Sequence, residues 1–122
     1  MAVQVVLATF ARRHTGSWPG VFELVDPTDQ VTLRGPGDSV KLQLYIRLAG
    51  LSLGPHQLVV GPYDNPISIL DFDTVPAHSG QHVSLVRGPF TLDFRVKPDS
   101  LRYPINVDQI VVGEARLAVA YL

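Results

Sequence analysis

The stretch that decides the fold is Leu101–Leu122, LRYPINVDQIVVGEARLAVAYL. It predicts two strands that fold back on each other around Asp108-Gln109, and the second is the most hydrophobic run in the chain. Successive side chains of a strand point to opposite faces. One face of the second strand therefore carries mainly larger apolar residues and the other carries charges and alanines: Ala115, Leu117, Val119 and Tyr121 against Glu114, Arg116, Ala118 and Ala120. An unpaired edge this apolar would invite aggregation. We therefore expect a central strand of a sheet, with another layer or chain against its alanine face.

Gly and Pro divide the rest of the chain into short apolar runs. In the clearest run, Ser39–Ala49, apolar and polar residues alternate from Val40 to Leu48 as in a half-buried strand. No window longer than about ten residues has the 3.6-residue period of an amphipathic helix without a Gly or Pro in it. The sequence predicts an all-β fold, an antiparallel β-sandwich (Ig-like or jelly-roll-like) of about eight or nine short strands, with a small β-barrel as the alternative.

The same alternation makes local predictions. A strand over Val3–Phe10 is expected to place Val3, Val5, Leu7 and Thr9 on one face, and a polar loop is expected over Ala11–Gly20. Arg87-Gly88-Pro89 is expected to end a strand over Gln81–Val86, with a separate strand starting at Phe90.

Length and charge limit the possible functions. The 122 residues fit one domain, 1–122, with a core of its own. The absence of cysteine rules out disulfides and thiolate-bound metals and fits a reducing, cytoplasmic location. A formal net charge of −1 argues against general nucleic-acid binding as the function. No run is long and apolar enough to span a membrane, and the N-terminal run lacks the flanks of a signal peptide, so it is expected to be a strand.

The composition favours an interface. Hydrophobic residues make up 46% of the chain, and charged residues only 17% against about 25% in an average domain. A small domain has much surface for its volume, so the apolar excess is expected to fill the core and to form a subunit or partner contact.

The histidines allow a metal-binding alternative. Pro76, Gly80 and His82 resemble the second metal motif of cupins, and His56 and His78 would complete the set. However, the chain has no His-x-His pair and no glutamate between Leu24 and Glu114, so we expect no metal and no cofactor.

Other catalytic patterns are weaker. No G-x-S-x-G elbow is present, and Ser79 beside His78 would point away from it in an extended chain. Asp71 and Asp73 would share a face if their strand runs that far, and a solvated strand end is the expected outcome.

The segment Ala11–Gly20 is the best candidate for binding. Arg12, Arg13 and His14 gather positive charge, and Trp18 is the only tryptophan. Arg and Trp are frequent anchors at protein interfaces, and long loops often carry binding residues. The competing interpretation is a solvated loop with Trp18 folded over one end of the core.

Part of the chain resembles small bacterial β-sandwich domains of uncharacterised function. The resemblance lies in Gly54-Pro55-His56-Gln57-Leu58-Val59-Val60 and in Tyr103–Val119 with Val112-Gly113-Glu114, and covers about half the chain. Asp108-Gln109 departs from the Asp-Gly that a tight hairpin prefers. The resemblance implies a fold and no activity.

From these observations we expect a non-enzymatic β-sandwich module that acts through protein–protein contact, either with a protein partner or as a homo-oligomer. Neither nucleic acid nor a membrane is an expected partner. The alternatives are a cupin-like barrel that binds a small molecule or a metal, and a structural subunit such as a phage component.

Overall fold

The structure, a computed structural model, describes residues 3–16, 23–34, 38–62, 66–74, 82–93 and 100–121. The described residues form nine strands joined by turns, which confirms the predicted all-β sandwich. No helix in these ranges could cross a membrane. The strands are β1 (Gln4–Thr15), β2 (Glu23–Thr28), β3 (Gln30–Leu33), β4 (Ser39–Ala49), β5 (Gly54–Val60), β6 (Ser68–Thr74), β7 (Val83–Asp93), β8 (Ser100–Val107) and β9 (Ile110–Tyr121).

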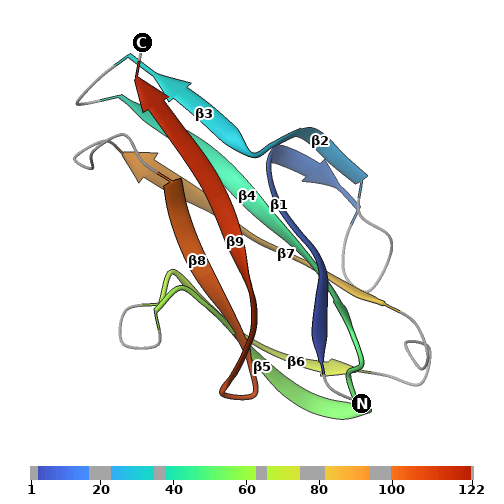
Figure 1. Cartoon of the computed structure of the whole chain (residues 1–122). Helices are drawn as coiled ribbons and strands as arrows, with labels where there is room; N and C mark the ends of the chain where they lie inside the picture. The colour runs from blue at the N-terminus through green and yellow to red at the C-terminus, as the bar shows by residue number, and fades with distance from the viewer. Residues whose placement is uncertain are drawn as a thin grey trace.

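The strands form two sheets that pack face to face (Figure 1). The four-stranded sheet has the order β2-β1-β4-β7, and the five-stranded sheet has the order β3-β9-β8-β5-β6. The five-stranded sheet is curled: β5 and β6 turn across the end of the molecule where the β8–β9 hairpin closes (Figure 1). β9 pairs with β8 on one side and β3 on the other, so the predicted central position of the C-terminal strand is confirmed.

On one side of the sandwich, the chain passes directly from one sheet to the other. β2 belongs to the four-stranded sheet and β3 to the five-stranded sheet, and only Asp29 separates them. The Asp29 carbonyl accepts a hydrogen bond from the Ala118 N–H at 2.8 Å, which fixes the crossing against β9. Because β3 crosses between the sheets and does not return as a hairpin, it pairs with β9 in parallel, an exception to the predicted antiparallel pairing.

On the opposite side of the sandwich, a side-chain hydrogen bond joins the two sheets. Arg87 on β7 donates from Nε to Ser68 Oγ on β6 at 2.7 Å. Among the described strands no backbone ladder joins β6 to β7, so the two sheets stay separate and the fold is a sandwich.

The core is built from the inward faces of both sheets. Val40, Leu42, Leu44, Ile46 and Leu48 of β4 are all buried, as their alternation predicts. Ala115, Leu117 and Val119 of β9 are buried too, which confirms the inward face for these three residues, and the side chain of Tyr121 lies outside the described part of the chain. The opposite face of β9 is not covered by core, since Arg116 is exposed and Ala118 and Ala120 are half-buried.

A bulge changes the faces of β1. Val5 pairs with Leu48 and Leu7 with Arg47, so Val6 is an extra residue in the ladder. Val5 packs against the core, whereas Leu7 is 42% exposed. The prediction that Val5 and Leu7 share a face is therefore wrong, because a bulge shifts the period-two alternation by one residue.

Two predicted strand ends are also wrong. β1 continues to Thr15, and His14 and Thr15 pair with Leu24 and Glu23 of β2, so the first part of the predicted loop is strand. β7 runs unbroken through Arg87-Gly88-Pro89, where the register against β4 shifts between Leu42 and Leu44. Pro89 has no N–H to donate, and this irregularity accommodates it in a strand at the end of its sheet.

The start of β1 approaches β9 at Gly113, which has no side chain. A Cβ added to Gly113 would lie 2.8 Å from Val5 Cγ2 and 3.0 Å from Val5 Cβ. Val5 is β-branched and has little rotamer freedom with which to retreat. Gly113 therefore allows the start of β1 to approach β9.

We predict that Gly113→Ala lowers the free energy of unfolding by about 1–2 kcal/mol, as overpacking of a tight contact does. Urea denaturation measures this. The loss should be smaller in a Val5→Ala background, because the 2.8 Å contact involves a Val5 methyl group. A Gly113→Ala protein more stable than wild type would contradict the packing argument, because alanine is otherwise the better strand residue.

Candidate functional site

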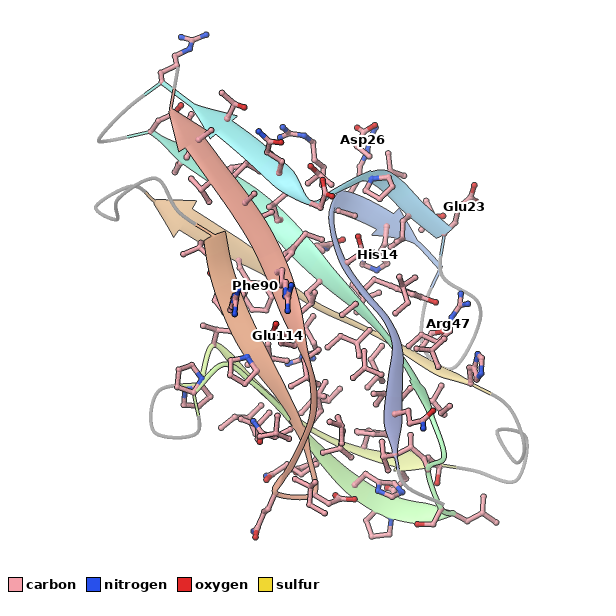
Figure 2. The ribbon with its side chains drawn as sticks, viewed as in Figure 1. His14, Glu23, Asp26, Arg47, Phe90 and Glu114 are labelled. Atoms are coloured by element: carbon pink, nitrogen blue, oxygen red, sulfur yellow. The ribbon has the colours of Figure 1, made fainter. Side chains whose placement is uncertain are left out.

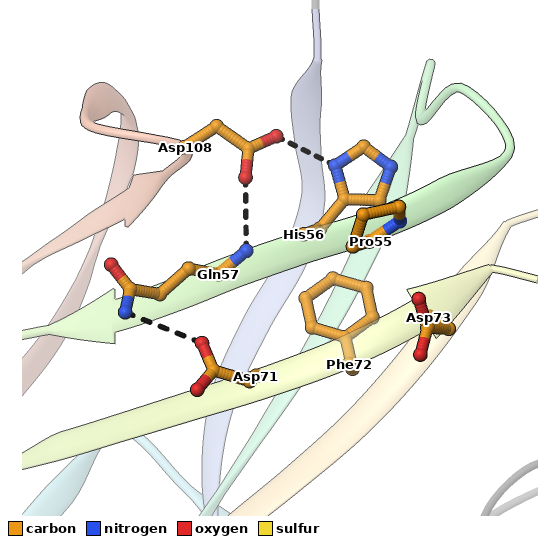
Figure 3. A pocket seen from close by; sticks show the side chains of 7 residues that line it. All are labelled: Pro55, His56, Gln57, Asp71, Phe72, Asp73 and Asp108. Carbon is orange, nitrogen blue, oxygen red and sulfur yellow. Dashed lines mark hydrogen bonds and ion pairs between the residues drawn. The ribbon is translucent and has the colours of Figure 1, made fainter.

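The most organised polar cluster lies at the start of β5, around His56 (Figure 3). His56 alternates with Leu58 and Val60 on the inward face of β5 and is only 8% exposed. Its Nδ1 lies 2.6 Å from Asp108 Oδ2 in the β8–β9 turn. Its Nε2 lies 2.7 Å from the carbonyl oxygen of Ser52, before β5. One ring therefore joins three segments of the chain.

Both ring nitrogens of His56 face oxygen acceptors. A carboxylate and a carbonyl oxygen have no hydrogen to give, so both contacts are hydrogen bonds only if both nitrogens carry a proton. Burial opposes this charge, but the hydrogen bonds to Ser52 and Asp108 outweigh it and raise the pKa of His56 above 6.5, with a smaller contribution from the Asp73 carboxylate. The two acceptor contacts and the raised pKa both favour the imidazolium form of His56.

Asp108 holds the hairpin turn to β5. Besides its bond to His56, its Oδ1 accepts the Gln57 N–H at 2.9 Å, and its own N–H donates to the Gln57 carbonyl at 2.9 Å. Burial raises the pKa of Asp108, but the hydrogen bonds from His56 and Gln57 prevail and lower it below 3.8. We refer to Ser52, His56, Gln57 and Asp108 as the end clamp.

The end clamp explains the unusual turn sequence. Asp108 and Gln109 have φ of 51° and 70°, the left-handed values that a two-residue type I′ hairpin turn requires. Glycine is usual at such positions, and Asn or Asp is tolerated at them. Asp108 is needed here for its carboxylate, whereas the structure shows no contact that requires Gln109.

An open hollow of about 360 Å³ lies beside the end clamp, as Figure 3 shows. Its lining residues are Pro55, His56, Gln57, Asp71, Phe72, Asp73 and Asp108. β6 extends to Thr74, so Asp71 and Asp73 share an exposed face, in line with the expected solvated strand end. The Phe72 ring forms part of the wall, with its centroid 5.7 Å from that of His56.

The geometry of His56 opposes two catalytic roles. In a serine nucleophile site the histidine would face a hydroxyl, but Nε2 faces the Ser52 carbonyl oxygen. A metal would need a ring nitrogen with a free lone pair, and each nitrogen of His56 is already engaged with an oxygen. His82 is exposed just before β7, and His78 lies outside the described residues. Within the described ranges no group of three or more His, Asp or Glu residues could hold a metal ion.

The predicted binding residues lie elsewhere. Arg12 and Arg13 are exposed on the last part of β1. His14 is half-buried, with Nδ1 2.5 Å from Gln43 Oε1 of β4, and lies on the four-stranded sheet (Figure 2). Trp18 lies outside the described residues. Arg12, Arg13 and His14 are thus consecutive residues of one strand, and the structure places none of them at the end clamp.

Sequence reasoning missed Ser52, Gln57 and Asp108. Two signals were available for them. Period two places His56 inward with Leu58 and Val60, and a buried ring needs hydrogen-bond partners. The lack of glycine in Asp108-Gln109 indicated that a side chain was holding the turn.

A second feature lies on the outer face of the five-stranded sheet, the face turned away from the core. Four residues pair in register across β6, β5, β8 and β9: Ile69 with Val59, Val59 with Asn106, and Asn106 with Val111. Ile69 is 54% and Val111 64% exposed, and both Val59 and Asn106 are buried between them. We refer to these four residues as the outer row. Ile110, which is 66% exposed at the hairpin end, pairs with the buried Val107 and lies on the other face of the sheet.

Comparison of the chain with protein-family models, curated proteins and solved structures finds no match. The resemblance to small bacterial β-sandwich domains therefore stays a prediction, and the function is inferred from the geometry alone.

The end clamp makes a prediction about pH. His56 has a raised pKa, so its contribution to stability is fully present below about pH 6.5 and is lost as the pH rises through its folded pKa. Asp108 has a lowered pKa, so its contribution is present above about pH 3.8 and is lost as the pH falls through its folded pKa. The clamp should stabilise the fold most between these two values.

We predict that His56→Gln lowers the free energy of unfolding at pH 6 by about 2 kcal/mol, the range for buried hydrogen bonds to a charged group. It should also flatten the decline of stability between about pH 6.5 and 9. Urea titrations across this range measure both effects. His82→Gln, at an exposed position, is the control and should leave the wild-type curve unchanged. A decline that persists unchanged in His56→Gln would assign it to another group.

Glycine should change the free energy of unfolding in opposite directions at the two turn positions, Asp108 and Gln109. Gln109→Gly should raise the free energy of unfolding by about 0.5–1 kcal/mol, because glycine avoids the penalty of a left-handed L-residue. Asp108→Gly relieves the same penalty but removes the bonds to His56 and Gln57, so it should lower stability by about 1–2 kcal/mol. Thermal unfolding of the two variants compares them directly. Equal effects of the two substitutions would mean that the Asp108 carboxylate does not hold the turn.

Proposed function

We propose that the chain is a non-enzymatic β-sandwich module that acts through protein contact, by self-association on the outer face of its five-stranded sheet. The observation that carries this proposal is the outer row, whose two apolar ends, Ile69 and Val111, are both more than half exposed. Continuous exposed apolar surface favours an interface; here the two exposed ends flank the buried Val59 and Asn106, so the row supplies two separate apolar contact points.

The row is too small to be a stable interface alone. Specific interfaces bury about 1,200 Å² or more of total surface, which needs some 20 residues on each side. The contact would therefore extend along β9 over Glu114, Arg116, Ala118 and Ala120, which lie on the same outer face. The half-buried alanines would let a second sheet come close.

The chemistry of the end clamp supports the non-enzymatic part of the proposal. His56 faces a carbonyl oxygen and a carboxylate, and its bonds tie β5 to the hairpin. A histidine with these contacts has a structural role, because its bonds hold the β8–β9 hairpin and, with it, Val111 at the start of β9. A cytoplasmic location and the absence of nucleic acid and membrane from its partners remain predictions from the composition.

Lysine substitutions test the proposed face. Val111→Lys should weaken self-association at least about tenfold, because burying an unpaired ammonium is strongly unfavourable. Val111 is exposed in the single chain, so the fold should tolerate the change. Sedimentation velocity from micromolar to hundreds of micromolar concentrations measures the effect.

Leu7→Lys is the matched control. Leu7 is also an exposed apolar residue on a strand, but it lies on the four-stranded sheet and should leave association unchanged. A wild-type protein that stays monomeric over this concentration range would contradict self-association. Dissociation by Leu7→Lys but not by Val111→Lys would move the interface to the other sheet.

A further inference from the structure

The outer face of β9 carries an ordered series of side chains. Asn106, Pro104, Arg102 and Ser100 of β8 are spaced by two residues, and they pair in register with Val111, Glu114, Arg116 and Ala118 of β9. The bulge between Val111 and Gly113 absorbs one residue, so these four side chains of β9 are evenly spaced on one face. In order along the strand they are large apolar, acidic, basic and small.

This series of side chains is complementary, in charge and in size, to the same series running in the opposite direction. When the strand is turned end for end about a point midway between Glu114 and Arg116, the acidic position meets the basic one. The same operation places the exposed Val111 over the small Ala118. A twofold axis that lies between two stacked sheets, at right angles to β9, performs this operation on a second copy of the chain.

The other twofold stacking is unfavourable. With the axis parallel to β9, each residue would meet its own counterpart, Glu114 on Glu114 and Arg116 on Arg116. Like charges that face each other across an interface disfavour it.

Within one chain, Arg116 and Glu114 already form an ion pair, Nε to Oε1 at 2.5 Å, with the Arg116 side chain 67% exposed. A guanidinium has five N–H donors, so it can bond the carboxylate of its own chain and that of a second chain together. Glu114 lies on β9 in the sheet nearer the viewer in Figure 2.

We propose that the occupant of this face is a second copy of the chain, stacked about a twofold axis that exchanges Glu114 with Arg116 and seats Val111 against Ala118. This rests on the proposed self-association and adds the partner's identity and register. The occupant is chosen by charge complementarity: one face of one chain supplies both members of each pair.

Two charge reversals test the register. Glu114→Arg places two arginines on the face, and Arg116→Glu places two glutamates there. In either homodimer the exchanged pairs become like-charged, so each variant alone should associate at least about tenfold more weakly than wild type. Light scattering and sedimentation velocity measure this, with circular dichroism to verify the fold.

A second experiment mixes the two variants and tests whether the charges act between chains. In a mixed pair, the arginine that Glu114→Arg introduces faces the glutamate that Arg116→Glu introduces. The unchanged Arg116 of the first chain faces the unchanged Glu114 of the second, so both pairs are again of opposite charge. The mixture should form a heterodimer with close to wild-type affinity, visible by native mass spectrometry. The ion pair within each chain stays broken in the mixture, so recovery must come from contacts between chains.

The outcomes separate the two proposals. Homodimers that persist in both single variants, or an equimolar mixture that stays monomeric, would overturn the twofold register while leaving the face open to the lysine test. A monomeric wild type would reject self-association itself.

Discussion

The structure depends on β9 having partners on both of its edges. β8 reaches it through a two-residue turn, and β3 reaches it because the chain passes from one sheet to the other at Asp29. β8 pairs with β9 from Ile110 to Ala118, and β3 covers the second edge from Ala118 to Tyr121, where Val119 is buried, so this end of the strand leaves no apolar edge open to aggregation. The contact of Val5 with Gly113 then brings the start of β1 against the same strand. The C-terminal strand thus connects both sheets.

The end clamp closes the sandwich at the hairpin end. β5 separates from β8 after three register pairs, so few backbone bonds hold it there. His56 replaces them with side-chain bonds to Asp108 and Ser52, and Thr74 Oγ1 donates to the same Ser52 carbonyl at 2.6 Å. Each buried polar atom has a partner, since no buried side-chain nitrogen or oxygen among the described residues lacks one. A charged histidine is compatible with the core here because its bonds are directed to fixed acceptors.

The proposed contact surface follows from these two features. The clamp fixes the hairpin, and the hairpin carries Val111 at one end of the outer face of β9. The bulge beside Val111 then aligns it with Glu114, Arg116 and Ala118 at even spacing. The alanines that suggested a covered face in the sequence lie at one end of this series, while the exposed apolar residues lie at the other. Along this strand the surface carries a large apolar, an acidic, a basic and a small residue, in that order. When a second copy is turned end for end, large meets small and acidic meets basic, so the surface suits a second copy of the chain.

The sequence by itself determined the all-β class, the inward faces of β4 and β9 and the hairpin at Asp108-Gln109. These depend on the period-two alternation and on turn chemistry, which are local properties of the chain. Only the tertiary structure decided the bulges that moved Leu7 outward and kept β7 continuous at Pro89, because a bulge depends on the neighbouring strand as well as on its own residues. It also decided the parallel pairing of β3 with β9 and the meeting of His56 with Asp108, which are 52 residues apart. No local pattern encodes such contacts, since they arise where the folded sheets bring distant residues within hydrogen-bond distance.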